Sequence, residues 1–316
     1  MTQLILHHYD FSNFSEKIRL ILGFKNLTWR SVEIPSHLPK PDYTPLTLGY
    51  RRTPALQIGA DIYCDTALIA DELERRFPEP SLYSPVSNDD DVNAEDLVRI
   101  RSASECLASW AEGPLLWPAA LYITGVHAEK FPDSFHFDRA KLHNKPTPSI
   151  AQVKKAGLSY FAEMKAQLER IEALLSSERS FLFGDEPCLA DFIIYGAPWL
   201  LETIGGQSPV INEMPKTRRW LSNIAKIGHG TFDNLSPDAA IDIANEATPL
   251  RTPAFEDDSF NSGERVKISP RDEYSPAEGY LVAIDEREIV IRGHNDRVNQ
   301  VYVHFPRIGY RVSRKK

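Results

Sequence analysis

Residues 4–19 constrain the fold more than any other stretch of the chain. An apolar run ends in two histidines, and a turn rich in serine and asparagine leads into a segment whose apolar residues Ile18, Ile21 and Leu22 have helical spacing. The stretch therefore predicts a strand, a tight turn and a helix. Backbone N–H groups at such a helix start lack partners, and together with the helix dipole they favour a bound anion.

Two hydroxyl groups, those of Ser12 and Ser15, lie at this predicted helix start. A thiol with a pKa of ~8.5 is mostly protonated at neutral pH, and a hydroxyl donor plus the helix start could lower that pKa by about one or two units. The geometry therefore suits a small thiolate. A simpler interpretation of the same stretch is that Ser12 or Asn13 is the helix N-cap, with Asn13 and Glu16 at capping-box spacing.

Composition and charge limit the class of protein. A chain of 316 residues predicts two or three domains, and 42% hydrophobic with 25% charged residues is typical of a globular protein. The net charge of -8 provides no basic surface for nucleic acid. We find no signal-peptide pattern and no stretch near the ~18 apolar residues of a membrane span. Three widely spaced cysteines lack metal-type spacing, so we expect a cytoplasmic protein without a bound metal.

The next elements complete a recognisable order. A strand at 27–34, a proline-rich connection at 35–45, a β-hairpin at 55–58 and 62–64, and a helix that opens at Asp65 and Thr66 follow the first helix. The order strand, helix, strand, break, strand, strand, helix is the thioredoxin-like arrangement. For Asp65, an ordinary N-cap role is the simpler alternative.

Three segments in this order carry a family resemblance. Residues 11–19, 52–56 and 65–69 resemble the amino-terminal domain of cytosolic glutathione transferases of the serine type. The resemblance implies that Ser12 donates to the glutathione sulfur, with Ser15 and Tyr9 as alternatives. Many relatives carry proline after this serine, whereas this chain has Asn13.

The same resemblance implies two further anchor points for glutathione, which would be bound as a co-substrate. Thr53, ahead of a cis proline at Pro54, would pair its backbone with the cysteinyl unit. Asp65 would meet the γ-glutamyl ammonium group, and Thr66 would bind the γ-glutamyl carboxylate at a helix N-terminus. Cys64 adjoins this pair, but its apolar strand indicates a buried small hydrophobe.

A polar stretch with Asp at positions 89–91 predicts a linker, and helices follow it. The patterns predict one helix at about 94–111, stopped by Gly113 and Pro114, and a long helix at about 149–175. Between them, residues 115–148 are longer than a helix connection needs. We expect Trp110, Trp117 and Tyr122 to line a hydrophobic acceptor pocket; the competing interpretation is that these aromatics fill a helix bundle.

A second resemblance to the family lies in residues 181–192. There a capping box starts a buried helix, and Asp191 matches the aspartate of that box, so its implied role is structural. Cys188 stands where the family has a hydroxyl residue, which weakens half of the box. Further helices are predicted at about 216–227 and 237–247.

The last part of the chain changes to a period of two. Beyond a linker at 248–261, five short strands predict a small all-β module, an SH3-like barrel: they are residues 265–268, 280–284, 288–292, 300–305 and 310–312. Its mixed charges favour a protein contact or subunit packing over nucleic acid. The segment 304–307 is distinctive, but its residues predict no chemistry beyond a strand that ends in a turn.

The sequence thus predicts three domains: a thioredoxin-like α/β domain at 1–84, an all-helical domain at 92–247 and the β module at 260–316. The resemblance implies a homodimeric detoxification enzyme, a glutathione transferase acting on a small hydrophobic electrophile. The alternative is a non-catalytic protein that keeps the glutathione fold as a scaffold and contacts a protein partner through residues 260–316.

Overall fold

The computed structural model describes residues 3–85, 93–142, 144–175, 177–206, 208–249, 255, 257, 259–272 and 276–315. The chain forms two compact units. The sheet unit comprises Met1–Ile18, Thr28–Leu73 and Thr231–Lys316, and the helical unit comprises Arg19–Leu27 and Glu74–Gly230. The predicted linker at 89–91 and most of residues 250–258 lie outside the described residues.

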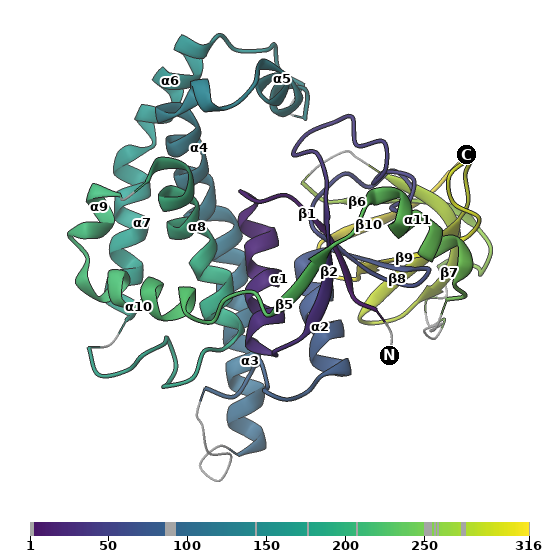
Figure 1. Cartoon of the computed structure of the whole chain (residues 1–316), viewed down its shortest axis with the longest axis horizontal. Coiled ribbons are helices and arrows are strands. Elements are labelled where there is room, and N and C mark those ends of the chain that lie inside the picture. Colours follow the sequence, from purple (N-terminus) through teal and green to yellow (C-terminus); the bar gives the residue numbers. More distant parts are fainter. Residues whose placement is uncertain are drawn as a thin grey trace. The chain divides into compact units, whose positions relative to one another are not determined.

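The sheet unit is built on a ten-stranded sheet with the order β10-β6-β7-β8-β9-β4-β3-β1-β2-β5. Figure 1 labels β1, β2, β5 and the C-terminal strands of this sheet. Its strands are β1 (Ile5–His8), β2 (Thr28–Glu33), β3 (Ala55–Ile58), β4 (Asp61–Cys64), β5 (Thr231–Asn234), β6 (Arg265–Pro270), β7 (Ala277–Ile284), β8 (Glu288–Gly293), β9 (Val301–Pro306) and β10 (Tyr310–Arg314).

The first four strands form the predicted thioredoxin-like arrangement. β1 and β2 are parallel, so they need a crossover connection, and helix α1 (Asn13–Phe24) provides it. β3 pairs antiparallel with β1 and with β4, and helix α2 (Thr66–Arg76) follows β4. The thioredoxin-like prediction is confirmed.

The five C-terminal strands are confirmed, and they continue the sheet of the first domain. β6 to β9 run as an antiparallel meander, and β10 returns to pair with β6. β9 then pairs in parallel with β4, with Ile62 opposite Val303. β5, which the sequence did not predict, pairs with β2. The two outer strands of the thioredoxin-like arrangement, β4 and β2, are thereby paired, and the edge strands of the whole sheet are β10 and β5.

A buried charged cluster lies where the C-terminal strands join β4. His304 on β9 has Nδ1 2.8 Å from Glu288 Oε2 and Nε2 3.0 Å from Asp61 Oδ1, and none of these side chains is more than 2% exposed. Burial opposes a charged ring, but the hydrogen bonds to both carboxylates outweigh it and raise the pKa of His304. This environment favours the imidazolium form, in which both ring nitrogens donate.

One hydrophobic core runs beneath this sheet from the first strands to the last. Ile5 and Ile62 of the early strands belong to the same buried cluster as Ile291 and Phe305 of the C-terminal strands. Helix α11 (Pro237–Glu246) contributes Ile241 and two alanines to this cluster. The C-terminal strands and the thioredoxin-like strands therefore share a core.

The helical unit is organised around α8, whose residues are mostly buried. Its elements are α3 (Ala94–Trp110), the π-helical turn η2 (Ala111–Leu115), α4 (Leu116–Val126), the 3-10 turn η3 (Ala128–Lys130), α5 (Asp133–Leu142), α6 (Ile150–Ser159), α7 (Phe161–Leu174), α8 (Leu189–Gly205), α9 (Pro209–Asn212) and α10 (Pro215–Ala225). The all-helical prediction is confirmed.

The helix predicted at about 94–111 is confirmed as α3, but the chain does not leave helical geometry at Pro114. A π-helical turn accommodates the proline: the Leu116 N–H donates to Ala111 O, five residues back, and α4 follows. A second helix prediction in this unit is wrong. The long helix at 149–175 is two helices that meet at Tyr160. Tyr160 keeps near-helical angles (φ -88, ψ -2), so the apolar pattern runs across the break and conceals it.

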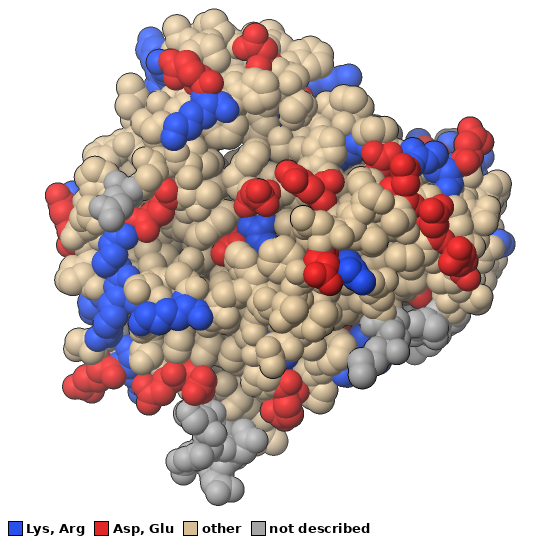
Figure 2. Space-filling view, viewed as in Figure 1, with Lys and Arg blue, Asp and Glu red and all other residues tan. Residues whose placement is uncertain are grey.

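Charges of both signs are present on the face drawn in Figure 2. Lys and Arg are interspersed with Asp and Glu there, and residues that are neither cover most of that face. Within the described part of the chain, none of the helices combines the length and the apolar character needed to cross a membrane. The described residues also contain no cluster of His, Cys, Asp or Glu that could hold a metal ion.

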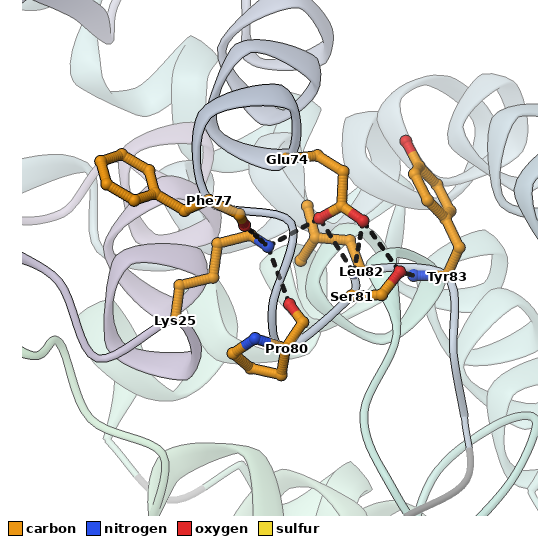
Figure 3. Close-up of polar contacts among 7 residues, drawn as sticks. All are labelled: Lys25, Glu74, Phe77, Pro80, Ser81, Leu82 and Tyr83. Atoms are coloured by element: carbon orange, nitrogen blue, oxygen red, sulfur yellow. Dashed lines mark hydrogen bonds and ion pairs between the residues drawn. The ribbon is translucent and has the colours of Figure 1, made fainter. Parts of the chain in front are cut away.

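A buried lysine fixes the chain after α2 (Figure 3). Lys25 Nζ donates to Glu74 Oε2 at 2.6 Å, to Phe77 O at 2.6 Å and to Pro80 O at 2.8 Å. The Glu74 carboxylate also accepts from the Leu82 backbone N–H. Burial lowers the pKa of Lys25, against the opposing effect of Glu74. These contacts hold residues 77–82, which directly follow α2.

We expect Lys25→Met to lower the free energy of unfolding by about 3 kcal/mol, because it leaves Glu74 without its cation and two carbonyl groups without their donor. Urea unfolding of the variant and the wild type measures the difference. Lys155→Met is the control, because Lys155 is exposed on α6 and its replacement should change stability by under about 0.5 kcal/mol. A loss below about 1 kcal/mol for Lys25→Met would contradict the structural role.

Candidate functional site

Strand register brings three of the predicted site segments to the same end of neighbouring strands, the edge of the sheet at which β1 and β4 finish and β3 starts. His7 of β1 lies opposite Ala55 of β3, and Ala55 lies opposite Cys64 of β4. The chain therefore leaves β1 toward Ser12, enters β3 from Pro54 and leaves β4 toward Asp65 at the same edge. Because neighbouring strands are about 4.8 Å apart, these three points converge there.

Ser12 is the N-cap of α1. Its Oγ accepts from the Ser15 N–H at 3.1 Å, its carbonyl accepts from the Glu16 N–H at 2.9 Å, and the residue is 2% exposed. The sequence left Ser12 and Asn13 open as the N-cap. Because helix α1 begins at Asn13, the N-cap residue is Ser12. The hydroxyl oxygen is used as an acceptor in this cap, and its proton can still be donated, because a serine hydroxyl does both.

The two alternative donors are also near the start of α1. Ser15 is fully buried, and its Oγ has no hydrogen-bond partner among the described residues. Tyr9 is partly exposed, with its ring 4.8 Å from that of Phe11 and 5.7 Å from Lys40 Nζ. Geometry alone therefore leaves Ser12, Ser15 and Tyr9 as candidates.

Thr53 is held by a residue that the sequence analysis missed. Lys40 Nζ donates to Thr53 Oγ1 at 2.6 Å and to Arg51 O at 3.0 Å, and Lys40 is 3% exposed. The Thr53–Pro54 peptide bond is cis, as expected. Lys40 lies in the proline-rich connection, where no local pattern indicates which residue a side chain will reach.

Asp65 takes an unusual backbone conformation at the start of α2. Its φ is +77°, and its Oδ1 accepts from the Ala67 N–H at 2.9 Å. Its Oδ2 accepts from the hydroxyl of Tyr310, the first residue of β10, at 3.0 Å. Thr66, the first helical residue, is 5% exposed. The C-terminal strands thus reach this end of the sheet directly.

The thiol beside this site is not a rival nucleophile. Cys64 is fully buried, and burial together with the Asp65 charge raises the pKa of its thiol well above the usual value. It therefore stays protonated and behaves as a small hydrophobe, as the sequence analysis expected.

The three aromatic residues predicted to line an acceptor pocket lie in the helical unit. Trp110 Nε1 donates to Gln167 Oε1 at 2.9 Å, and the rings of Tyr122 and Phe161 are 5.5 Å apart, so two of the three pack against α7. Trp117 on α4 is 52% exposed. For Trp110 and Tyr122, these contacts fit the competing interpretation of helix packing.

Asp191 has the structural role that the sequence predicted. Its buried carboxylate accepts from the backbone N–H groups of Leu182 and Cys188 and from Trp220 Nε1 at 2.8–3.0 Å. Cys188 completes the capping box because its sulfur faces the Asp191 backbone N–H, and its thiol also donates to Asp191 Oδ2 at 3.4 Å. The thiol therefore replaces the hydroxyl that the family carries.

Comparisons with known proteins agree with this architecture. Residues 6–81 match the family model "Glutathione S-transferase, N-terminal domain", and residues 126–227 match "Glutathione S-transferase, C-terminal domain". A GST-like protein from Pseudomonas syringae is 37% identical over 100% of both chains, with a TM-score of 0.68. Its match therefore includes the C-terminal strands. No curated protein matches the chain.

More distant structures share the fold over part of the chain. Glutathione transferase F2 from Populus trichocarpa is 15% identical, covers 71% of this chain and 96% of its own, and has a TM-score of 0.51. A glutathione S-transferase from Methylobacillus flagellatus kt with GSH bound is 14% identical, with 72% and 99% coverage and a TM-score of 0.50. The two matched domains and the full-length Pseudomonas syringae relative show that this chain belongs to the glutathione S-transferase family.

Proposed function

We propose that this protein binds glutathione at the edge of the sheet where β1, β3 and β4 meet α1 and α2, and that it keeps the glutathione thiol ionised. The observation that carries the proposal is the register that aligns His7, Ala55 and Cys64. Because of this register, three proposed anchors that lie far apart in the sequence come just beyond the aligned strand ends: Ser12, Thr53 and Asp65.

Each anchor has a distinct role in this proposal. Ser12 donates its hydroxyl proton to the sulfur while its oxygen caps α1. The backbone of Thr53, held through Lys40, pairs with the cysteinyl unit in the manner of an added strand. Asp65 binds the γ-glutamyl ammonium, and the N-terminus of α2 at Thr66 binds the γ-glutamyl carboxylate.

The reaction that follows is attack of the thiolate on an electrophilic carbon of a small hydrophobic molecule. The thiol proton leaves to solvent, a C–S bond forms, and the electrophile either loses its leaving group or takes up a proton. The bound GSH in the Methylobacillus flagellatus kt relative is consistent with glutathione as the co-substrate. The acceptor, homodimerisation and cytoplasmic location stay predictions.

Ser12→Ala tests the proposal. We expect it to raise the pKa of the bound glutathione thiol by about one unit, because about 1.4 kcal/mol of thiolate stabilisation is lost, while affinity changes by less than about threefold. Ultraviolet titration of the thiolate measures the pKa, and calorimetry measures the affinity.

Ser236→Ala is the matched control, because Ser236 caps α11 through the same kind of hydrogen bond, to the Ala239 N–H. It loses a cap and should leave the thiol pKa unchanged. If Ser12→Ala also leaves that pKa unchanged, Ser15→Ala and Tyr9→Phe identify the donor. A normal thiol pKa in wild-type protein that binds glutathione, with no turnover of electrophiles, would instead support the non-catalytic scaffold.

A further inference from the structure

The C-terminal strands deliver a tyrosine hydroxyl to the proposed glutathione site. β9 runs parallel to β4 with Tyr63 opposite His304, so both strands end at the same edge of the sheet. The chain then turns through Gly309, whose φ of +87° suits a residue without a side chain, and Tyr310 opens β10. The Tyr310 hydroxyl donates to Asp65 Oδ2 at 3.0 Å.

A second tyrosine fixes the direction of this hydrogen-bond chain. The hydroxyls of Tyr50 and Tyr310 are 2.6 Å apart. Because the single proton of Tyr310 goes to Asp65, Tyr50 must be the donor within the tyrosine pair. The chain therefore runs from Tyr50 through Tyr310 to the carboxylate, and each hydroxyl is held in one orientation.

The two tyrosines are rigid and remain protonated. Tyr50 is 1% exposed and Tyr310 is 4% exposed, and both rings pack against Phe305 with centroids 5.3 and 5.6 Å away. Burial, reinforced by the Asp65 charge, raises the pKa of both hydroxyls well above the usual value. They consequently act as fixed donors over the whole physiological pH range.

We propose that Tyr310 is a positioning residue for glutathione recognition: it holds the Asp65 carboxylate in the orientation that receives the α-ammonium group of the γ-glutamyl unit. Together with the bond from the Ala67 N–H, it fixes both oxygens of the carboxylate. The C-terminal strands thereby set selectivity for ligands that carry this ammonium. The inference rests on the proposed function.

The test uses two ligands and the full-length protein. One ligand is glutathione, and the other is its glutaryl analogue, which lacks only the α-ammonium group. Calorimetry should show that the wild type prefers glutathione. In Tyr310→Phe, we expect glutathione affinity to fall about tenfold while affinity for the glutaryl analogue changes by less than about twofold.

Two further variants accompany it. Tyr50→Phe removes the donor to Tyr310 but leaves the bond to Asp65, so glutathione affinity should fall about threefold, again with the analogue unaffected. Tyr280→Phe is the control, because Tyr280 on β7 is exposed and should change neither affinity.

The outcomes separate the two proposals. Equal weakening of both ligands in Tyr310→Phe would show a merely structural role, and no weakening would exclude Tyr310 from recognition; either result overturns this inference and leaves the glutathione site standing. A wild-type protein that does not bind glutathione would overturn the proposed function together with this inference.

Discussion

Replacing His304 with leucine is expected to lower the free energy of unfolding by about 4 kcal/mol, because two buried carboxylates lose the hydrogen-bonded ring between them. Asp61 and Glu288 lie on the strands on either side of β9, and each contacts one ring nitrogen. Leucine has a similar size but no donor. Urea unfolding followed by circular dichroism measures the loss.

The stability of the same variant, measured as a function of pH, should show whether His304 is protonated in the wild type. Its folded pKa is raised above the unfolded value of about 6.5, so its stabilisation is fully present below that pH and is lost as pH rises through the folded pKa. The difference in stability between wild type and His304→Leu should therefore shrink at high pH. Asp61, Glu288 and the stacked ring of Tyr63, 4.4 Å away, are the groups that face it.

His294→Leu is the control for this experiment. His294 is exposed, so its replacement should alter stability by under about 0.5 kcal/mol. A His304→Leu loss as small as that of the control, or a loss that grows with pH, would contradict an imidazolium held between two carboxylates.

Asp65→Asn is expected to lower glutathione affinity about thirtyfold, which corresponds to about 2 kcal/mol. The amide keeps the shape of the side chain, tolerates the φ of +77° and can still accept from the Ala67 N–H. Its NH2 group replaces the oxygen that accepts from Tyr310, so the variant removes both the charge that meets the ammonium and the hydrogen bond that holds the carboxylate. Calorimetry at neutral pH measures the change.

Asp285→Asn is matched to this variant. Asp285 likewise accepts from the backbone N–H two residues ahead, that of Arg287, but it lies in the turn before β8. Its replacement should leave glutathione affinity unchanged. If the two variants bind glutathione equally well, Asp65 is not the residue that recognises the ammonium.

Much of the fold could be predicted from local sequence patterns. The strand, turn and helix of residues 4–19 and the order of elements through α2 follow from apolar spacing and turn residues, and the five C-terminal strands follow from a period of two. Ser12, Thr53 and Asp65 could be proposed because their motifs are local and stand in a familiar order.

The residues that the sequence did not reveal act across long separations. The pairing of β4 with β9 joins Ile62 to Val303, and Tyr310 reaches Asp65 from 245 positions away in the chain. Nothing near His304 indicates that it lies between acids from two other strands. The expected end of the helical path at Pro114 is wrong for a local reason. A proline ordinarily ends a helix, but here it lies within a π-helical turn that continues into α4.

The central claim is that the start of α1 keeps the sulfur of bound glutathione ionised. Titration of the thiolate absorbance in the wild-type complex tests it most directly. We expect the pKa of the bound thiol to lie about one or two units below that of free glutathione. A bound thiol that titrates at the same pH as the free tripeptide would contradict the account.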